Sequence, residues 1–224
     1  MTTFFFGNEK APNVLIQAAG SHDPDAAEKE VKALRRLTSA DFCLIAVQVA
    51  DWNRDLSPWE APAVFGKEGF GKDAGNTLDA VLNLCTDPGR NYIIGGYSLA
   101  GLFALWAAHQ TDRFCGVAAA SPSVWFPGFI GYMREHRIRT GTVCLSLGDR
   151  EEKTRNPVMA AVGSCIRQAD EILREQGVRT ALEWNPGGHF RDADLRTARA
   201  FAWVLNETAD PARSGGKAGP APGL

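Results

Sequence analysis

The chain has 224 residues, 45% of them hydrophobic, and a formal net charge of −2 at pH 7. Acids and bases nearly balance, so there is no basic field to hold a nucleic-acid backbone, and nucleic acid is not expected as a partner. No apolar run approaches the roughly 20 residues that a membrane span needs. The first residues also lack the basic start and apolar stretch of a secretion signal. We therefore expect a cytoplasmic protein with no membrane contact.

The five cysteines and four histidines show no metal-binding pattern. The cysteines are odd in number, lie far apart in apolar surroundings and form no CxxC pair, so we expect reduced core residues. No two histidines have the spacing of a zinc site. The sequence therefore predicts neither a metal nor another cofactor.

Short apolar runs alternate with amphipathic segments along the chain. The predicted strands are residues 14–17, 42–49, 92–94, 116–120, 143–147 and 180–184, and predicted helices include residues 25–37, 156–176 and 192–205. Strands alternating with helices predict an α/β fold, in which a mostly parallel sheet is covered by helices on both faces. The length fits one domain at residues 1–208. Residues 209–224 are rich in Pro, Gly and Ala and predict a disordered tail.

A glycine-rich segment joins the strand at residues 92–94 to an apolar helical segment. Its sequence is Gly95-Gly96-Tyr97-Ser98-Leu99-Ala100-Gly101. A serine on such a strand–turn–helix junction is held in a strained backbone conformation, which requires small neighbours such as Gly96 and Ala100. The junction would expose the Ser98 hydroxyl and aim the Leu99 amide at a developing oxyanion. The alternative is a tightly packed turn with Ser98 as a helix cap, but the buried strand and apolar helix around it favour a nucleophile.

A serine nucleophile needs a histidine base, and His189 has the most suitable position. In proteins whose nucleophile lies on such a junction, the catalytic residues follow the chain order serine, acid, histidine. His22 comes too early, His109 lies in the helix after Ser98, and His136 lies in a charged, exposed segment. His189 follows the last predicted strand in a glycine-rich loop. Its alternative interpretation is a solvent-exposed loop histidine.

The acid is expected directly after the strand at residues 143–147. Three carboxylates compete there, in Gly148-Asp149-Arg150-Glu151-Glu152. A glycine followed three residues later by the acid is a frequent spacing and selects Glu151. Asp149 is second and Glu152 third, and at least two of the three must be surface charges.

Four segments together resemble one family of enzymes. They are Gly96-Tyr97-Ser98-Leu99-Ala100-Gly101, Ser121-Pro122-Ser123-Val124-Trp125-Phe126, Ser146-Leu147-Gly148-Asp149-Arg150-Glu151 and Gly187-Gly188-His189-Phe190. In this order they resemble the esterase family of α/β hydrolases that contains enterochelin-esterase-like and feruloyl-esterase-like enzymes. The resemblance implies an α/β-hydrolase fold and ester hydrolysis by Ser98, His189 and an acid near Glu151. The chain departs from the family in having Ala100 where many relatives have glycine. Its leading strands also look shortened or absent.

Loops at the carboxyl ends of the predicted strands supply the candidate pocket. The loop after the first strand suggests Ala18 or Ala19 as a second oxyanion donor, although an ordinary turn of small residues is the alternative. Trp52, Trp59 and Trp125 follow other strands and are candidates for the pocket wall, or else they anchor their loops to the core. The short connections predict a compact molecule without a large lid, which favours small, soluble esters.

The sequence therefore predicts a serine carboxylesterase that forms an acyl-enzyme on Ser98, with a small-molecule ester as its partner. An acyltransferase that uses the same acyl-enzyme is an alternative, and a non-catalytic binding module on this fold is another. Residues 66–73 match the start of a phosphate-binding loop, but Asp73 replaces the hydroxyl residue that would hold Mg²⁺, so nucleotide binding is not expected. The sequence does not determine the oligomeric state.

Overall fold

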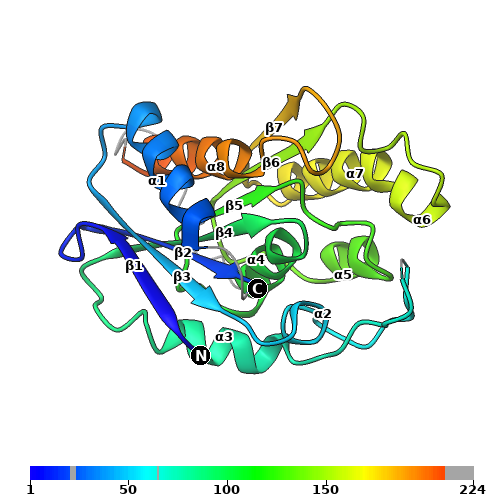
Figure 1. Cartoon of the computed structure of the whole chain (residues 1–224), viewed down its shortest axis with the longest axis horizontal. Coiled ribbons are helices and arrows are strands. Elements are labelled where there is room, and N and C mark those ends of the chain that lie inside the picture. The colour runs from blue at the N-terminus through cyan, green and yellow to red at the C-terminus, as the bar shows by residue number, and fades with distance from the viewer. Residues whose placement is uncertain (21–23, 65, 210–224) are drawn as a thin grey trace, which may run out of the picture.

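The computed structural model describes residues 1–20, 24–64 and 66–209, so nearly all of the tail predicted at residues 209–224 lies outside the described residues. Within the described part, seven strands form one sheet in the order β1-β3-β2-β4-β5-β6-β7 (Figure 1). Their bounds are Thr3–Gly7 for β1, Asn13–Ala19 for β2, Phe42–Gln48 for β3, Asn91–Tyr97 for β4, Gly116–Ala120 for β5, Thr142–Gly148 for β6 and Arg179–Asn185 for β7.

The prediction of a mostly parallel sheet is confirmed, and β1 is the strand that it missed. Strands β2 to β7 pair in parallel, whereas β1 is an edge strand that pairs with β3 in antiparallel fashion. Strand β1 therefore precedes the parallel strands as an antiparallel edge strand. Side chains such as Phe5, which is 48% exposed, are too accessible for β1 to show the continuous burial of the central strands.

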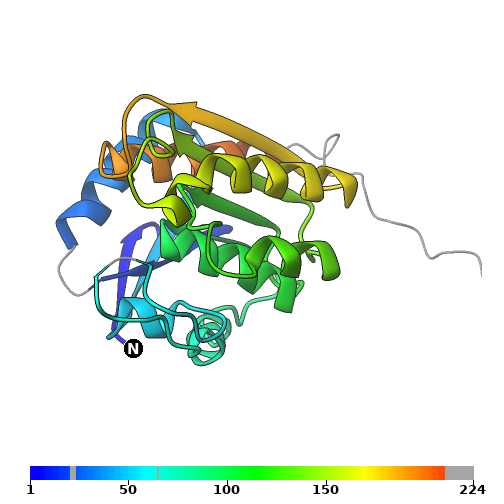
Figure 2. The same ribbon diagram turned by 90° about the vertical axis from the view of Figure 1, so that its right-hand side faces the viewer.

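Helices cover both faces of the sheet (Figures 1 and 2). Helices α1 (Pro24–Leu37) and α8 (Ala193–Thr208) pack on one face, with Leu34 and Phe201 in the same apolar core. The other face carries the larger core, formed with α3 (Ala74–Leu82), α4 (Leu99–Gln110), α5 (Phe129–Glu135) and α7 (Val162–Glu175). Two short helices, α2 (Trp52–Asp55) and α6 (Pro157–Ala160), complete the set found among the described residues.

The helix predicted at residues 156–176 is divided in two. Helix α6 ends at Ala160 and α7 begins at Val162, with Ala161 between them. The predicted start is confirmed, because Asn156 Oδ1 accepts hydrogen bonds from the backbone N–H groups of Val158 and Met159, at 3.0 and 3.2 Å. Across residues 1–20, 24–64 and 66–209, no helix is both long enough and apolar enough to cross a membrane.

The strand order creates a crevice at the carboxyl end of the sheet. Strand β2 lies between β3 and β4, so the chain leaves β2 toward one side and later returns to β4 on the other. Loops that depart in opposite directions leave an open site outside the carboxyl ends of such strands. These ends point toward α2 and α6 (Figure 1). Ser98 directly follows β4 at this position.

Two glycines bring α8 close to the sheet. A Cβ atom at Gly95 would lie 2.5 Å from Cζ of Phe201 and 2.6 Å from the carbonyl oxygen of Ala118. One at Gly116 would lie 2.3 Å from Cγ1 of Val204. Side chains at these positions would therefore push α8 away from the strands, and α8 carries residues that reach the site described below.

We predict that Gly95→Ala lowers the free energy of unfolding by about 1–3 kcal/mol, because the new methyl group overlaps a backbone carbonyl and a buried ring. The matched control is Gly131→Ala on the exposed side of α5, where a Cβ meets no atom within 4 Å. There the same substitution should raise stability by up to about 1 kcal/mol, since alanine favours helix. Chemical denaturation measures both, and equal stabilities for the two variants would contradict the proposed close approach.

Candidate active site

The backbone at Ser98 is strained as the sequence predicts. Its φ is 58° and its ψ is −120°, a left-handed conformation that residues other than glycine rarely adopt. Surrounding hydrogen bonds hold it there: the Ser98 amide donates to the carbonyl of Ala120 at 3.1 Å, and the Ser98 carbonyl accepts from the amide of Ser123 at 3.0 Å. The serine is thereby fixed between β4 and α4.

Small neighbours make this conformation possible. Gly96 has a φ of 152°, and a Cβ atom there would lie 2.7 Å from the Cβ of Ala100. A Cβ at Gly101 would lie 3.0 Å from the carbonyl oxygen of Gly96. Ala100 fits in place of the more usual glycine because Gly96, facing it, has no side chain.

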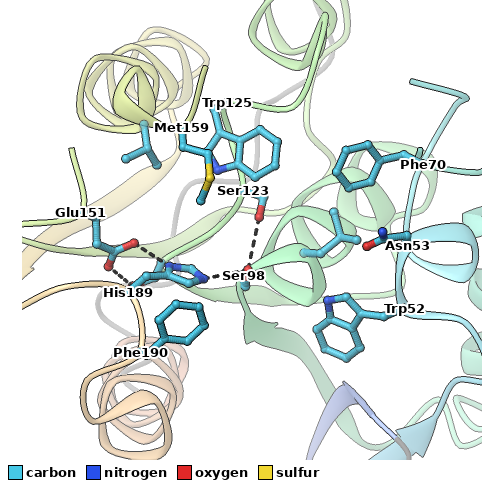
Figure 3. A pocket seen from close by; sticks show the side chains of 13 residues that line it. Trp52, Asn53, Phe70, Ser98, Ser123, Trp125, Glu151, Met159, His189 and Phe190 are labelled. Atoms are coloured by element: carbon cyan, nitrogen blue, oxygen red, sulfur yellow. Dashed lines mark hydrogen bonds and ion pairs between the residues drawn. The ribbon is translucent and has the colours of Figure 1, made fainter. Parts of the chain in front are cut away.

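His189 bridges Ser98 and Glu151 across the crevice (Figure 3). Its Nε2 lies 3.0 Å from Oγ of Ser98, and its Nδ1 lies 2.7 Å from Oε2 of Glu151. An ionised carboxylate only accepts hydrogen bonds, so Nδ1 carries a proton toward Glu151, and in this tautomer Nε2 is the acceptor for the Ser98 hydroxyl. Ser98 occupies the N-cap position of α4, but its side chain forms no cap hydrogen bond with the helix.

Of the three candidate acids, it is Glu151 that contacts His189. The Glu151 amide donates to the carbonyl of Gly148 at 3.1 Å, and this turn brings the carboxylate back toward the end of β6. Asp149 instead accepts a hydrogen bond from the Gly187 amide at 2.7 Å, and Glu152 pairs with Arg167 at 3.5 Å. The three carboxylates therefore have three separate partners.

The second oxygen of Glu151 is held by three donors. Oε1 accepts from the Gly148 amide at 2.7 Å, the Ser121 hydroxyl at 2.7 Å and Nη1 of Arg196 at 2.8 Å. Burial of the carboxylate would raise the pKa of Glu151, but hydrogen bonds from His189, Ser121 and Gly148 outweigh it, and the pKa lies below its ordinary value. Glu151 is therefore ionised at neutral pH, with Oε2 left to orient the imidazole.

Arg196 is a member of this cluster that the sequence analysis missed. Its side chain is 1% exposed, and besides Glu151 it contacts the hydroxyls of Ser121 and Tyr97 at 3.2 Å. One signal pointed to it: Arg196 lies four and eight residues before Ala200 and Val204, which places it on the buried face of α8. An arginine on a buried helix face requires buried acceptors.

The loop that carries His189 is tied to the sheet by its backbone. The Tyr97 hydroxyl donates to the carbonyl of His189 at 2.5 Å. Burial is the main reason why the pKa of Tyr97 is raised, so this phenol keeps its proton and remains a donor. The next residue, Phe190, packs edge-on against the imidazole, with 5.3 Å between ring centroids.

Of the candidate oxyanion donors, Leu99 lies at the cavity, whereas Ala18 and Ala19 do not line it. Leu99 lines the crevice as the first residue of α4, where backbone N–H groups have no acceptor within the helix. Ala18 and Ala19 end β2 and do not line the cavity at Ser98. The loop that follows them includes residues 21–23, which lie outside the described part, so a second donor there stays a prediction.

A cavity of about 420 Å³ opens beside Ser98. Trp52 and Trp125 line it, as the sequence analysis predicted. Trp59 does not: its Nε1 donates to the carbonyl of Pro127 at 2.9 Å, and its ring packs against Phe126. The prediction of Trp59 as a pocket residue is therefore wrong, because the indole anchors its loop to the core. Further lining residues, which the sequence did not predict as pocket residues, are Asn53, Phe70, Ser121, Ser123, Met159, Val162 and Phe190.

The sequence matches no protein-family model and no curated protein. Solved structures do match the fold. An IroE-like serine hydrolase from Shewanella oneidensis aligns with a TM-score of 0.72 and 14% identity, over 92% of this chain and 75% of that one. The siderophore hydrolase EstA from Aspergillus nidulans aligns with a TM-score of 0.63 and 19% identity, over 88% and 83%. Est1E from Butyrivibrio proteoclasticus aligns with a TM-score of 0.59 and 13% identity, over 93% and 94%.

The chain has the α/β-hydrolase fold. This confirms the fold expected from the resemblance, and the similar structures include a ferulic acid esterase and an enterobactin esterase. In this α/β-hydrolase fold β4 leads to Ser98, β6 to Glu151 and β7 to His189. Three separate loops at one edge of the sheet thus supply the three hydrogen-bonded side chains.

We predict that Glu151→Gln lowers the free energy of unfolding at pH 7 by about 3 kcal/mol, because it leaves the buried charge of Arg196 without its anionic partner. The pKa of Glu151 is lower in the folded than in the unfolded chain. Its stabilising effect is therefore complete above the unfolded value, near 4.5, and is lost as the pH falls through the folded pKa.

Denaturation of the wild type and Glu151→Gln from pH 7 to pH 3 tests this prediction. The difference in stability should stay constant near neutral pH and shrink below pH 4.5. Glu152→Gln is the control, since its ion pair with Arg167 is partly exposed and its loss should change stability by less than about 1 kcal/mol. A Glu151→Gln effect no larger than that of the control would contradict the role of the buried pair.

Proposed function

We propose that the protein is a serine carboxylesterase that hydrolyses a small ester through an acyl-enzyme on Ser98. The observation that carries this proposal is the unbroken hydrogen-bond chain from Glu151 through His189 to Ser98. This chain ends at the wall of a cavity that admits a small molecule. A serine hydroxyl becomes nucleophilic when such a base accepts its proton.

In the acylation step Oγ of Ser98 attacks the ester carbonyl while Nε2 of His189 takes the hydroxyl proton. Glu151 keeps the proton on Nδ1 and stabilises the imidazolium that forms. The tetrahedral oxyanion is stabilised by the Leu99 amide at the start of α4. His189 then returns its proton to the leaving alcohol, and the carbonyl forms again as the acyl-enzyme.

Deacylation repeats these steps with water as the nucleophile. His189 accepts a proton from the water molecule that attacks the acyl carbonyl, and it gives that proton back to Ser98 as the acid product leaves. The hydroxyl of Ser123 lies beside the nucleophile, with its Oγ 3.3 Å from Oγ of Ser98. It therefore offers Ser98 a second hydrogen-bond partner when the imidazole is protonated.

The similar structures support this chemistry by their names, which include a serine hydrolase and a siderophore hydrolase.

The cavity supports a neutral, mainly apolar substrate. Four aromatic side chains line it, namely Trp52, Phe70, Trp125 and Phe190. Its titratable lining residues are Glu151 and His189, and both are engaged in the hydrogen-bond chain. We therefore expect an ester whose acyl group carries no charge.

We predict that Ser98→Ala and His189→Ala each reduce kcat on a short-chain p-nitrophenyl ester by about 10⁴-fold or more, because each removes a member of one proton-transfer unit. Glu151→Gln should reduce kcat by about 10³-fold or more, because the histidine loses its fixed tautomer. Steady-state kinetics measures these losses. Asp149→Asn is the matched control and should retain far more activity, since Asp149 contacts the Gly187 amide.

A fluorophosphonate probe distinguishes this enzyme from a non-catalytic module. The wild type should be labelled, and Ser98→Ala should not. Lack of labelling in the folded wild type would contradict the proposal. An added alcohol acceptor should leave the free acid as the main product, whereas mainly transfer product would show that the protein is an acyltransferase.

We predict that Phe190→Ala raises KM for a short-chain aryl ester by about tenfold, because the substrate loses an aromatic contact at the mouth of the cavity. The Phe190 side chain is 96% exposed, so its removal should change the free energy of unfolding by less than about 0.5 kcal/mol. Phe5→Ala, which removes an exposed phenylalanine from β1, is the control and should leave KM unchanged. Equal KM values for Phe190→Ala and the wild type would contradict a substrate contact.

A further inference from the structure

We propose that Arg196 is a positioning residue that joins the acid to the histidine loop and offsets the negative charge that Glu151 places beside His189. The inference rests on the proposed function of Ser98 and His189. It goes beyond that function, because the proposed acylation and deacylation steps involve only residues at the wall of the cavity. Arg196 lies behind them, on α8.

Arg196 connects the acid to the histidine loop by three hydrogen bonds. Nη1 of Arg196 donates to Oε1 of Glu151 at 2.8 Å, and Nη2 donates to the carbonyls of Pro186 and Gly188 at 3.1 Å each. These carbonyls flank the turn that leads directly to His189. One planar guanidinium therefore holds both the acid and the backbone of the base, and it fixes the distance between them. A lysine offers a single point charge and cannot span these acceptors.

The charges of Arg196 and Glu151 lie away from water. The side chains of Arg196 and Glu151 are 1% and 3% exposed, so their charges act on each other and on His189 with little screening by water. Without Arg196 the buried carboxylate would face the imidazole as an uncompensated anion and would favour its protonation. A protonated His189 cannot accept the Ser98 proton. The guanidinium thus offsets the negative charge of Glu151 next to the imidazole.

The other charged groups near the loop are less suited to this effect. Arg191 and Asp192 pair with each other at 3.3 Å, and both are more than half exposed. Asp149 accepts the Gly187 amide, and the pKa of Tyr97 is raised by burial, so that its phenol stays neutral. Among the residues that the structure describes, the titratable and charged groups in or against the histidine loop are Glu151, Asp149, Tyr97, Arg191, Asp192 and Arg196.

The test compares the pH dependence of wild type, Arg196→Met and Arg196→Lys. The readouts are kcat/KM on a short-chain p-nitrophenyl ester and the rate at which a fluorophosphonate labels Ser98. Arg196→Met should lower the plateau rate by about 100-fold through misplacement of the base. It should also move the acidic limb upward by about one pH unit, because removal of a nearby positive charge favours the protonated imidazole. Arg196→Lys should lower the plateau but leave the limb near its wild-type position.

The matched control is Arg199→Met on the same helix. Arg199 is exposed and donates to Oδ1 of Asn185 at 3.1 Å, so the identical substitution should leave both the plateau and the limb unchanged. A folded Arg196→Met variant whose limb stays at the wild-type pH would overturn the proposal, even if its rate falls. If Arg196→Met does not fold, the test uses Arg196→Lys. An acidic limb of its pH profile that moves upward although the positive charge is retained would also overturn the proposal.

The labelling rate separates this inference from the proposed function. If the wild type reacts with the probe but hydrolyses no ester, the carboxylesterase proposal fails while the labelling limbs still measure the effect of Arg196. If the limbs of the labelling rate behave as expected and esters are turned over, both proposals are supported.

Discussion

The strained backbone of Ser98 is the constraint on which the site depends. A left-handed serine between a buried strand and a buried helix is held by the hydrogen bonds of its neighbours, and it is accommodated because Gly96 lacks a side chain. This strained conformation directs the hydroxyl away from the helix and toward the crevice, where it contacts His189. Any relaxation of this turn would move the nucleophile and the Leu99 amide together.

A second constraint is the placement of charge beneath the histidine. Glu151 and Arg196 are both buried, and each would be costly alone. Together they form a pair whose members also satisfy Ser121, Gly148 and the loop carbonyls. The close approach of α8 to the sheet at Gly95 makes this pair possible, so the packing of an amphipathic helix determines the electrostatics of the site.

Much of the fold and of the candidate site follows from local sequence patterns. Six of the seven described strands were predicted because central parallel strands are continuous apolar runs. The junction at Ser98 was recognised because backbone strain demands small residues at fixed positions. The spacing from Gly148 to Glu151 selected the acid that contacts His189, since this spacing matches the turn closed by the Glu151 amide.

The sequence by itself determined the strand order along the chain, the strained serine and the short list of partners, because these depend on neighbours within a few residues. Tertiary structure alone decided what depends on distant contacts. It placed Trp59 against Pro127 and not in the cavity. The sequence could not decide this, because a tryptophan in a loop can equally well line a pocket or anchor the loop to the core. It revealed the edge strand β1, whose weak burial leaves little pattern, and it brought Arg196 to Glu151 across 45 positions of sequence. The sequence around a side chain does not show which distant residue will become its partner in the folded protein.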